Sequence, residues 1–69
     1  MAANMEKLRQ FVKAKNISFE LLAKAAGIDL STFYRKVKSG GDNFTIGEVH
    51  AMVDGELMNR DEAIHIFLE

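Results

Sequence analysis

The chain has 69 residues, a formal net charge of −1, and neither proline nor cysteine. Apolar residues make up 48% of it and charged residues 28%, which is typical of a folded domain and not of a disordered segment. The lack of cysteine excludes disulfides, thiolate metal sites and a cysteine nucleophile. Because no apolar run approaches the ~18 residues of a membrane span, we expect one soluble cytoplasmic domain over residues 1–69.

Helical periodicity dominates the chain, and we expect an all-α bundle of five short helices. The first helix is predicted from about Asn4 to Lys15, with Met5, Leu8, Phe11 and Val12 on one stripe. Ser18 is the predicted N-cap of a second helix over 19–26, which turns Leu22, Ala23 and Ala26 inward. Gly27 then fits the left-handed residue that commonly ends a helix.

Asp29 is the predicted N-cap of the third helix, which ends near Ser39. Its residues form two stripes at helical spacing: an apolar stripe of Leu30, Phe33 and Val37, and a polar stripe of Ser31, Arg35 and Lys38.

Two capping boxes mark the last two helices, Thr45 with Glu48 and Asn59 with Glu62. The fourth helix is predicted to stop before Gly55 and to turn Ile46, Val49 and Val53 inward. The fifth is predicted from about Arg60 to Leu68, with Ala63, Ile64, Phe67 and Leu68 as its apolar residues.

Charge is divided unevenly along the chain. Residues 1–38 hold eight Lys or Arg against three acids, giving +5, and residues 39–69 hold one Arg against seven acids, giving −6. Such an asymmetry points to an interaction surface, with a polyanion as the natural partner of the basic half.

The stretch "LAKAAGIDLSTFYRKVKSG" combines a helix, a glycine turn and a second helix. Ala23 lies four residues before Gly27, and Phe33 lies six residues after it. Two helices that cross over such a short turn need a small residue where they approach, and apolar residues on both sides. The polar face of the second helix then points outward.

These residues resemble the helix-turn-helix of the phage Cro and repressor family, the xenobiotic-response-element-type transcriptional regulators. "FTIGEV" and "DEAIHIFLE" look like the fourth-helix start and the ending of short phage and prophage regulators of this type. The resemblance implies a lambda-repressor-like DNA-binding domain, with its helix-turn-helix at about residues 18–39. It also implies a regulator that binds double-stranded operator DNA through the third helix, in the major groove.

The resemblance carries over individual roles by position. Ser31 and Arg35 would contact bases, with Leu30 and Thr32 beside them; periodicity leaves Leu30 open between a thymine contact and the core. Phosphate contacts would come from Ser18, Tyr34, Lys36, Lys38 and Asn43. The chain departs from the family pattern at Phe19, where the family often has a glutamine near a phosphate.

Taken alone, the cluster of Arg35, Lys36 and Lys38 is more typical of a solvated helix face, and the helix-turn-helix spacing is what favours nucleic acid. His50 and His65 lie on different predicted helices and lack a third metal ligand. The sequence therefore indicates a binding protein with no cofactor, metal or small-molecule substrate, and not an enzyme.

The last helix has apolar residues on more than one side, because Ile66 lies away from the other apolar positions. Ile66 and Leu68 are therefore either core residues or part of a partner surface. Two protein partners are candidates: a second copy, giving a homodimer, and a phage repressor protein. The second would make the chain an antirepressor, an alternative favoured by the acidic C-terminal half.

Overall fold

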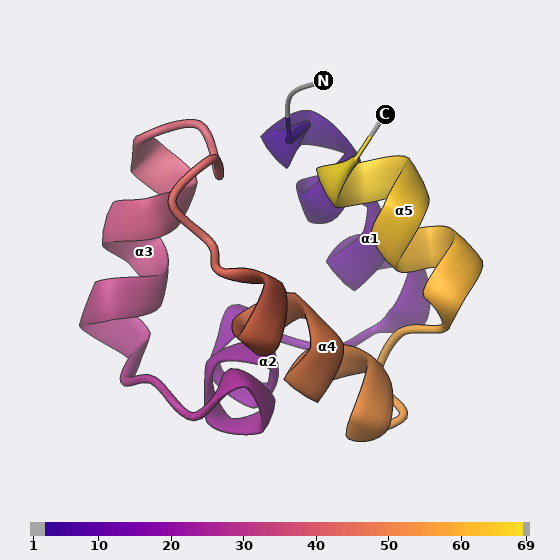
Figure 1. Ribbon diagram of the computed structural model, residues 1–69. Helices are drawn as coiled ribbons and strands as arrows, with labels where there is room; N and C mark the ends of the chain where they lie inside the picture. The colour runs from indigo at the N-terminus through magenta and orange to yellow at the C-terminus, as the bar shows by residue number, and fades with distance from the viewer. Residues whose placement is uncertain (1–2, 69) are drawn as a thin grey trace.

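The structure is a computed structural model that describes residues 3–68. Those residues form an all-α fold of five helices without a strand, as the sequence predicts (Figure 1). The helices are α1 (Met5–Lys15), α2 (Phe19–Ala26), α3 (Leu30–Lys38), α4 (Ile46–Asp54) and α5 (Arg60–Phe67). No helix among the described residues is long and apolar enough to cross a membrane.

Side-chain caps begin all five helices. In each case the N-cap oxygen accepts a hydrogen bond from the backbone amide three residues later, which satisfies a donor that the helix itself leaves unpaired. The caps are Asn4, Ser18, Asp29, Thr45 and Asn59. Both predicted capping boxes are confirmed, because the side chains of Glu48 and Glu62 accept from the cap amides at 2.9 Å.

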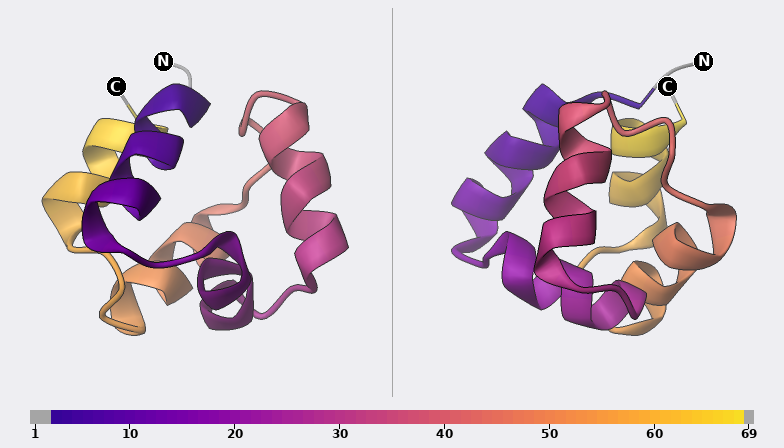
Figure 2. Two further views of the ribbon diagram at one scale, coloured as in Figure 1. Left: turned by 180° about the vertical axis from the view of Figure 1, so that it is seen from behind. Right: turned by 90° about the vertical axis from the view of Figure 1, so that its left-hand side faces the viewer.

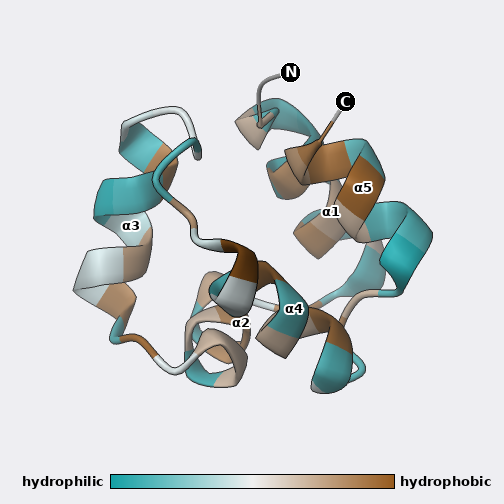
Figure 3. Cartoon of the chain, in the orientation of Figure 1, coloured by the Kyte–Doolittle hydropathy of each residue, from teal (hydrophilic) through white to brown (hydrophobic). Residues whose placement is uncertain are grey.

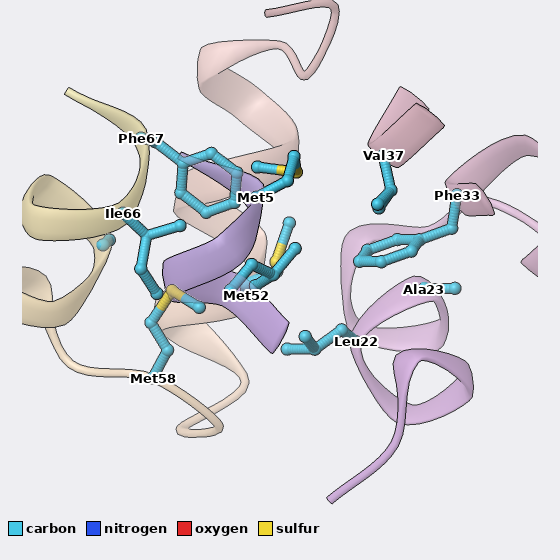
Figure 4. Packing of buried hydrophobic residues seen from close by; sticks show 11 residues of the cluster. Met5, Leu22, Ala23, Phe33, Val37, Met52, Met58, Ile66 and Phe67 are labelled. Atoms are coloured by element: carbon cyan, nitrogen blue, oxygen red, sulfur yellow. The ribbon is translucent and has the colours of Figure 1, made fainter. Parts of the chain in front are cut away.

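A three-residue turn joins α2 to α3. Gly27 ends α2 in the left-handed region at φ 79°, as predicted, and Asp29 caps α3 two residues later. The two helices pack through Phe33, which has no exposed surface and lies near Leu22 and Ala23 (Figure 4).

A row of aromatic contacts crosses the molecule from α2 to α5. The ring centroids are 5.2 Å apart for Phe19 and Phe33, 5.1 Å for Phe33 and Phe44, and 5.4 Å for Phe44 and Phe67. Tilted and edge-on pairs at these distances each contribute about 0.5–1.5 kcal/mol beyond the burial of their area. Phe44 in the α3–α4 loop is therefore the bridge between α3 and α5.

The remaining core is built from aliphatic and methionine side chains. Met5, Met52 and Met58 are buried with Leu8 and Ile66 between α1, α4 and α5. The beginning of α1 is tied to the end of α5, because the amide of Asn4 donates to the carbonyl of Ile66 at 2.7 Å. Figure 2 shows α1 and α5 together on one side of the molecule and α3 on the other.

One prediction about the last helices is wrong, and one alternative that the sequence left open is decided. Ile46 does not face inward but is 86% exposed, and Met52 is the buried residue of α4. For Ile66 the sequence left core and partner surface open, and its 2% exposure makes it a core residue. Helix α5 buries Ala63, Ile66 and Phe67, a set spaced i, i+3, i+4, and thereby turns Ile64 and Leu68 outward.

Gly41 provides a test of the packing between the α3–α4 loop and α1. It has φ 86°, and a Cβ added there would overlap the Met5 side chain, whereas one added at Gly40, with φ 96°, would meet open space. We expect Gly40→Ala to cost about 1–2 kcal/mol for its left-handed backbone. Gly41→Ala should cost a further ~1–3 kcal/mol of overpacking, measured by urea denaturation. Equal losses in the two variants would contradict this close approach.

Candidate nucleic-acid interface

Helix α3 separates an inner apolar face from an outer polar face. Phe33 and Val37 are buried, while Ser31, Tyr34, Arg35 and Lys38 are exposed. Leu30 and Thr32, the other predicted base contacts, are half-buried at the start of the helix. Leu30 is not among the side chains packed against the core cluster, so part of it faces solvent beside Ser31.

Hydrogen bonds to the Asp29 carboxylate organise the N-terminal end of this face. The carboxylate accepts from the amide of Thr32 at 3.2 Å and from the hydroxyl of Ser31 at 3.0 Å. Side-chain hydrogen bonds from Thr32 and Ser31, with the Thr32 amide, lower the pKa of Asp29 below its ordinary value of 3.8. Because the Ser31 hydrogen is donated to Asp29, the lone pairs of its oxygen remain available to accept.

Tyr34 is held against Phe19 on α2. Tyr34 is 49% exposed, and its ring meets the ring of Phe19 edge-on, with centroids 5.6 Å apart. Phe19 stands where the resemblance would place a glutamine, and it packs against the ring of Tyr34. The helix-turn-helix pattern did not predict this pair. The available signal was the presence of two aromatic residues, Phe19 and Tyr34, on either side of the turn.

Lys36 does not belong to the free basic surface that the sequence predicts. Its Nζ lies 3.0 and 3.1 Å from the two carboxylate oxygens of Glu48 and donates to the carbonyl of Asn43 at 3.0 Å. Its side chain is only 18% exposed. Helical spacing placed it beside Arg35, but the fold of the α3–α4 loop brings an acid from α4 against it.

The carboxylate of Glu48 has two structural roles. Partial burial raises the pKa of Glu48, but the hydrogen bonds from Thr45 and Lys36 and the charge of Lys36 outweigh this effect. The pKa therefore lies below its ordinary value of 4.5. Glu48 both completes the capping box of α4 and fixes α4 to α3.

The residues that flank α3 are held by local hydrogen bonds. The side-chain amide of Asn43 donates to the hydroxyl of Ser39 at 3.2 Å, and that hydroxyl donates to the carbonyl of Lys36 at 2.9 Å. Ser18 accepts from the amide of Leu21 at 3.2 Å as the cap of α2. Both Ser18 and Asn43 are exposed, as a phosphate contact would require.

Ion pairs join the basic and acidic halves of the chain. Lys36 pairs with Glu48, and Lys15 pairs with Glu62 at 3.2 Å between α1 and α5. Among residues 3–68, neither Arg35 nor Lys38 has an ion-pair partner. The charge left free on the outer face of α3 is therefore that of these two side chains.

The described residues contain no cluster of three potential metal ligands. The imidazole of His50 lies 3.2 Å from the carboxylate of Asp54 one turn away, on an exposed stretch of α4. No protein-family model matches the chain, and comparisons with curated proteins and with solved structures give no significant match.

The pairing of Glu48 predicts how stability changes with pH. Glu48→Gln keeps an acceptor for the capping box but removes the charge, so we expect a loss of about 1–3 kcal/mol at pH 7. Because the folded-state pKa of Glu48 is lowered, its contribution is present above pH 4.5 and is lost as the pH falls through the lowered value.

Thermal denaturation from pH 7 to pH 2.5 tests this expectation, with Glu20→Gln, at an exposed position on α2, as the control. The difference in melting temperature between the wild type and Glu48→Gln should become smaller in acid, while the control melts close to the wild type at every pH. A difference in melting temperature that does not change with pH would show that the charge of Glu48 contributes nothing to stability.

Proposed function

We propose that the protein is a sequence-specific DNA-binding transcriptional regulator of the Cro or repressor type. The observation that carries the proposal is the outer face of α3, where Arg35 and Lys38 are exposed and unpaired among the described residues. This helix follows α2 through a left-handed turn at Gly27, in the order and spacing of a helix-turn-helix.

Base recognition falls to the first two turns of α3. In the major groove, the guanidinium of Arg35 can donate two hydrogen bonds to O6 and N7 of a guanine. Ser31, whose own hydrogen goes to Asp29, acts as an acceptor and so suits the amino group of adenine or cytosine. The exposed parts of Leu30 and Thr32 offer methyl groups to a thymine methyl.

Phosphate contacts fix the position of the helix on the duplex without reading sequence. Lys38 supplies the unpaired charge, and Tyr34, Ser18 and Asn43 supply exposed polar groups around it. Lys36 contributes indirectly, because its bonds to Glu48 and Asn43 hold the loop next to this surface. The protein would regulate by occupying a promoter and not by catalysing a reaction.

The distribution of acids is compatible with this orientation. Figure 1 shows the end of α4 and the start of α5 on the side of the molecule away from α3. Asp54, Glu56 and Asp61 lie in this region. A duplex that approaches α3 therefore meets Arg35 and Lys38 before it meets these carboxylates, which limits repulsion by the acidic half.

A second candidate function is favoured by a different face. Exposed apolar side chains gather between α4 and α5, as expected of a surface that binds a protein. An antirepressor that binds another regulator through this face would need no DNA contact from α3. Salt dependence separates the two functions, because binding to phosphates weakens steeply as salt rises.

The decisive test is a titration of the protein against the DNA upstream of its own gene and against a scrambled duplex, at two salt concentrations. We expect tighter, salt-sensitive binding to the upstream DNA. Arg35→Ala should cost about 1–3 kcal/mol and relax the preference at one base pair, whereas Lys38→Ala should weaken all sequences alike and reduce the salt slope by about one.

Lys13→Ala, at an exposed position on α1, is the matched control and should change little. Equal small losses for Arg35→Ala and Lys38→Ala on every sequence would contradict base reading by Arg35. A folded protein that binds neither duplex would contradict the DNA-binding proposal itself and favour the antirepressor.

A further inference from the structure

The ring of Phe19, at the beginning of α2, lies against two neighbouring side chains of α3. Its centroid is 5.2 Å from that of Phe33, which is fully buried, and 5.6 Å from that of Tyr34, which is half exposed. Consecutive side chains of a helix point about 100° apart, so one ring reaches both of them from the flank of α3. Phe19 therefore joins the core side of α3 to its outer side.

The hydroxyl of Tyr34 is available to a ligand. Among residues 3–68 it has no hydrogen-bond partner, and a phenol hydroxyl can both donate and accept. Figure 3 shows the hydrophobic colour of α3 at its start and on the side toward the core, whereas its outer side is pale or hydrophilic. Tyr34 is thus a neutral polar group on a hydrophilic helix face, with its ring fixed from α2.

The side chains around Tyr34 favour an anion as that ligand. Lys38 follows it by four residues, and residues at this spacing lie on one face with about 5–6 Å between their Cβ atoms. The charge of Lys38 is exposed and has no ion-pair partner among the described residues, and the same holds for Arg35. A phosphate drawn to Lys38 therefore comes within reach of the phenol, which is a common donor to the phosphates of DNA.

We infer that Phe19 is a positioning residue, which holds the ring of Tyr34 so that its hydroxyl donates to a backbone phosphate of bound DNA. The inference rests on the proposed function. It adds to that function a phosphate contact without charge, and a residue of α2 that fixes a contact made by α3.

Two physical effects follow from this arrangement. An exposed side chain loses rotamer freedom when it binds, which weakens binding. Contact with Phe19 already restricts the ring of Tyr34 in the free protein, so less freedom is lost on DNA. In addition, a neutral hydroxyl displaces no counterion from DNA, so its contribution does not depend on salt, unlike that of Lys38.

NMR of the full chain without DNA tests the positioning. Tyr34 is the only tyrosine in the sequence, so its ring protons can be identified. Because a neighbouring aromatic ring shifts such signals, Phe19→Leu should move them toward the positions of a tyrosine in an unfolded peptide. Phe11→Leu is the matched control, since Phe11 is a half-buried phenylalanine that packs against the same core from α1. It should leave the Tyr34 signals in place, and both variants should keep their helical circular dichroism.

DNA titrations at two salt concentrations test the phosphate contact. Tyr34→Phe should weaken binding to the upstream and the scrambled duplex alike, about 10-fold, and by the same factor at both salt concentrations. Phe19→Leu should weaken binding about 3- to 10-fold in the wild type. In the Tyr34→Phe background it should change binding by less than about 2-fold, because the hydroxyl that it positions is then absent. Phe11→Leu should bind like the wild type.

Three results would overturn the inference while the wild type still binds the upstream DNA. The Tyr34 signals could stay in place in Phe19→Leu, Tyr34→Phe could bind as tightly as the wild type, or Phe19→Leu could cause the same loss in both backgrounds. The last result would give Phe19 a purely structural role. A folded wild type that binds neither duplex would instead reject the proposed function, and the phosphate contact with it.

Discussion

The ring of Phe33 fixes the orientation of α3. It has no exposed surface, and it contacts Phe19 on α2 and Phe44 in the following loop, so α3 is anchored on both flanks. Once Phe33 points inward, helical geometry turns Ser31, Arg35 and Lys38 outward. Truncating a buried phenylalanine usually costs about 3–5 kcal/mol, which is a large share of the stability of so small a domain. The same side chain therefore supports both the core and the candidate DNA surface.

Ion pairs in the folded structure neutralise part of the charge asymmetry of the sequence. Lys36 and Lys15 belong to the basic half, yet both pair with acids of the other half, Glu48 and Glu62. Those two acids also complete the capping boxes of α4 and α5. Each carboxylate thereby connects the beginning of one helix to the flank of another. A cluster of three basic residues on α3 becomes a surface with two free charges, and this sharpens the assignment of Arg35 and Lys38.

The small size of the domain limits how much apolar surface it can bury. A chain of 69 residues has a limited core, and this one leaves a further apolar face uncovered between α4 and α5. The antirepressor alternative uses the same apolar face but leaves the unpaired charges of α3 without a role.

Local chemistry was sufficient to predict the helices. The caps at Ser18, Asp29, Thr45 and Asn59 and the left-handed Gly27 set the helix ends within about one residue, because each acts on backbone groups a few positions away. Local chemistry did not predict which apolar residues of α4 and α5 point inward. Ile46 faces solvent instead of the core, and the open choice for Ile66 falls to the core, because α4 and α5 are apolar on two sides and only packing against the other helices selects which side is buried. The partner of Lys36 was equally hidden, since Glu48 is twelve residues away and reaches it through the fold of the loop. The sequence alone thus determined where the helices begin and end, whereas long-range packing decided which of their faces remain free to bind.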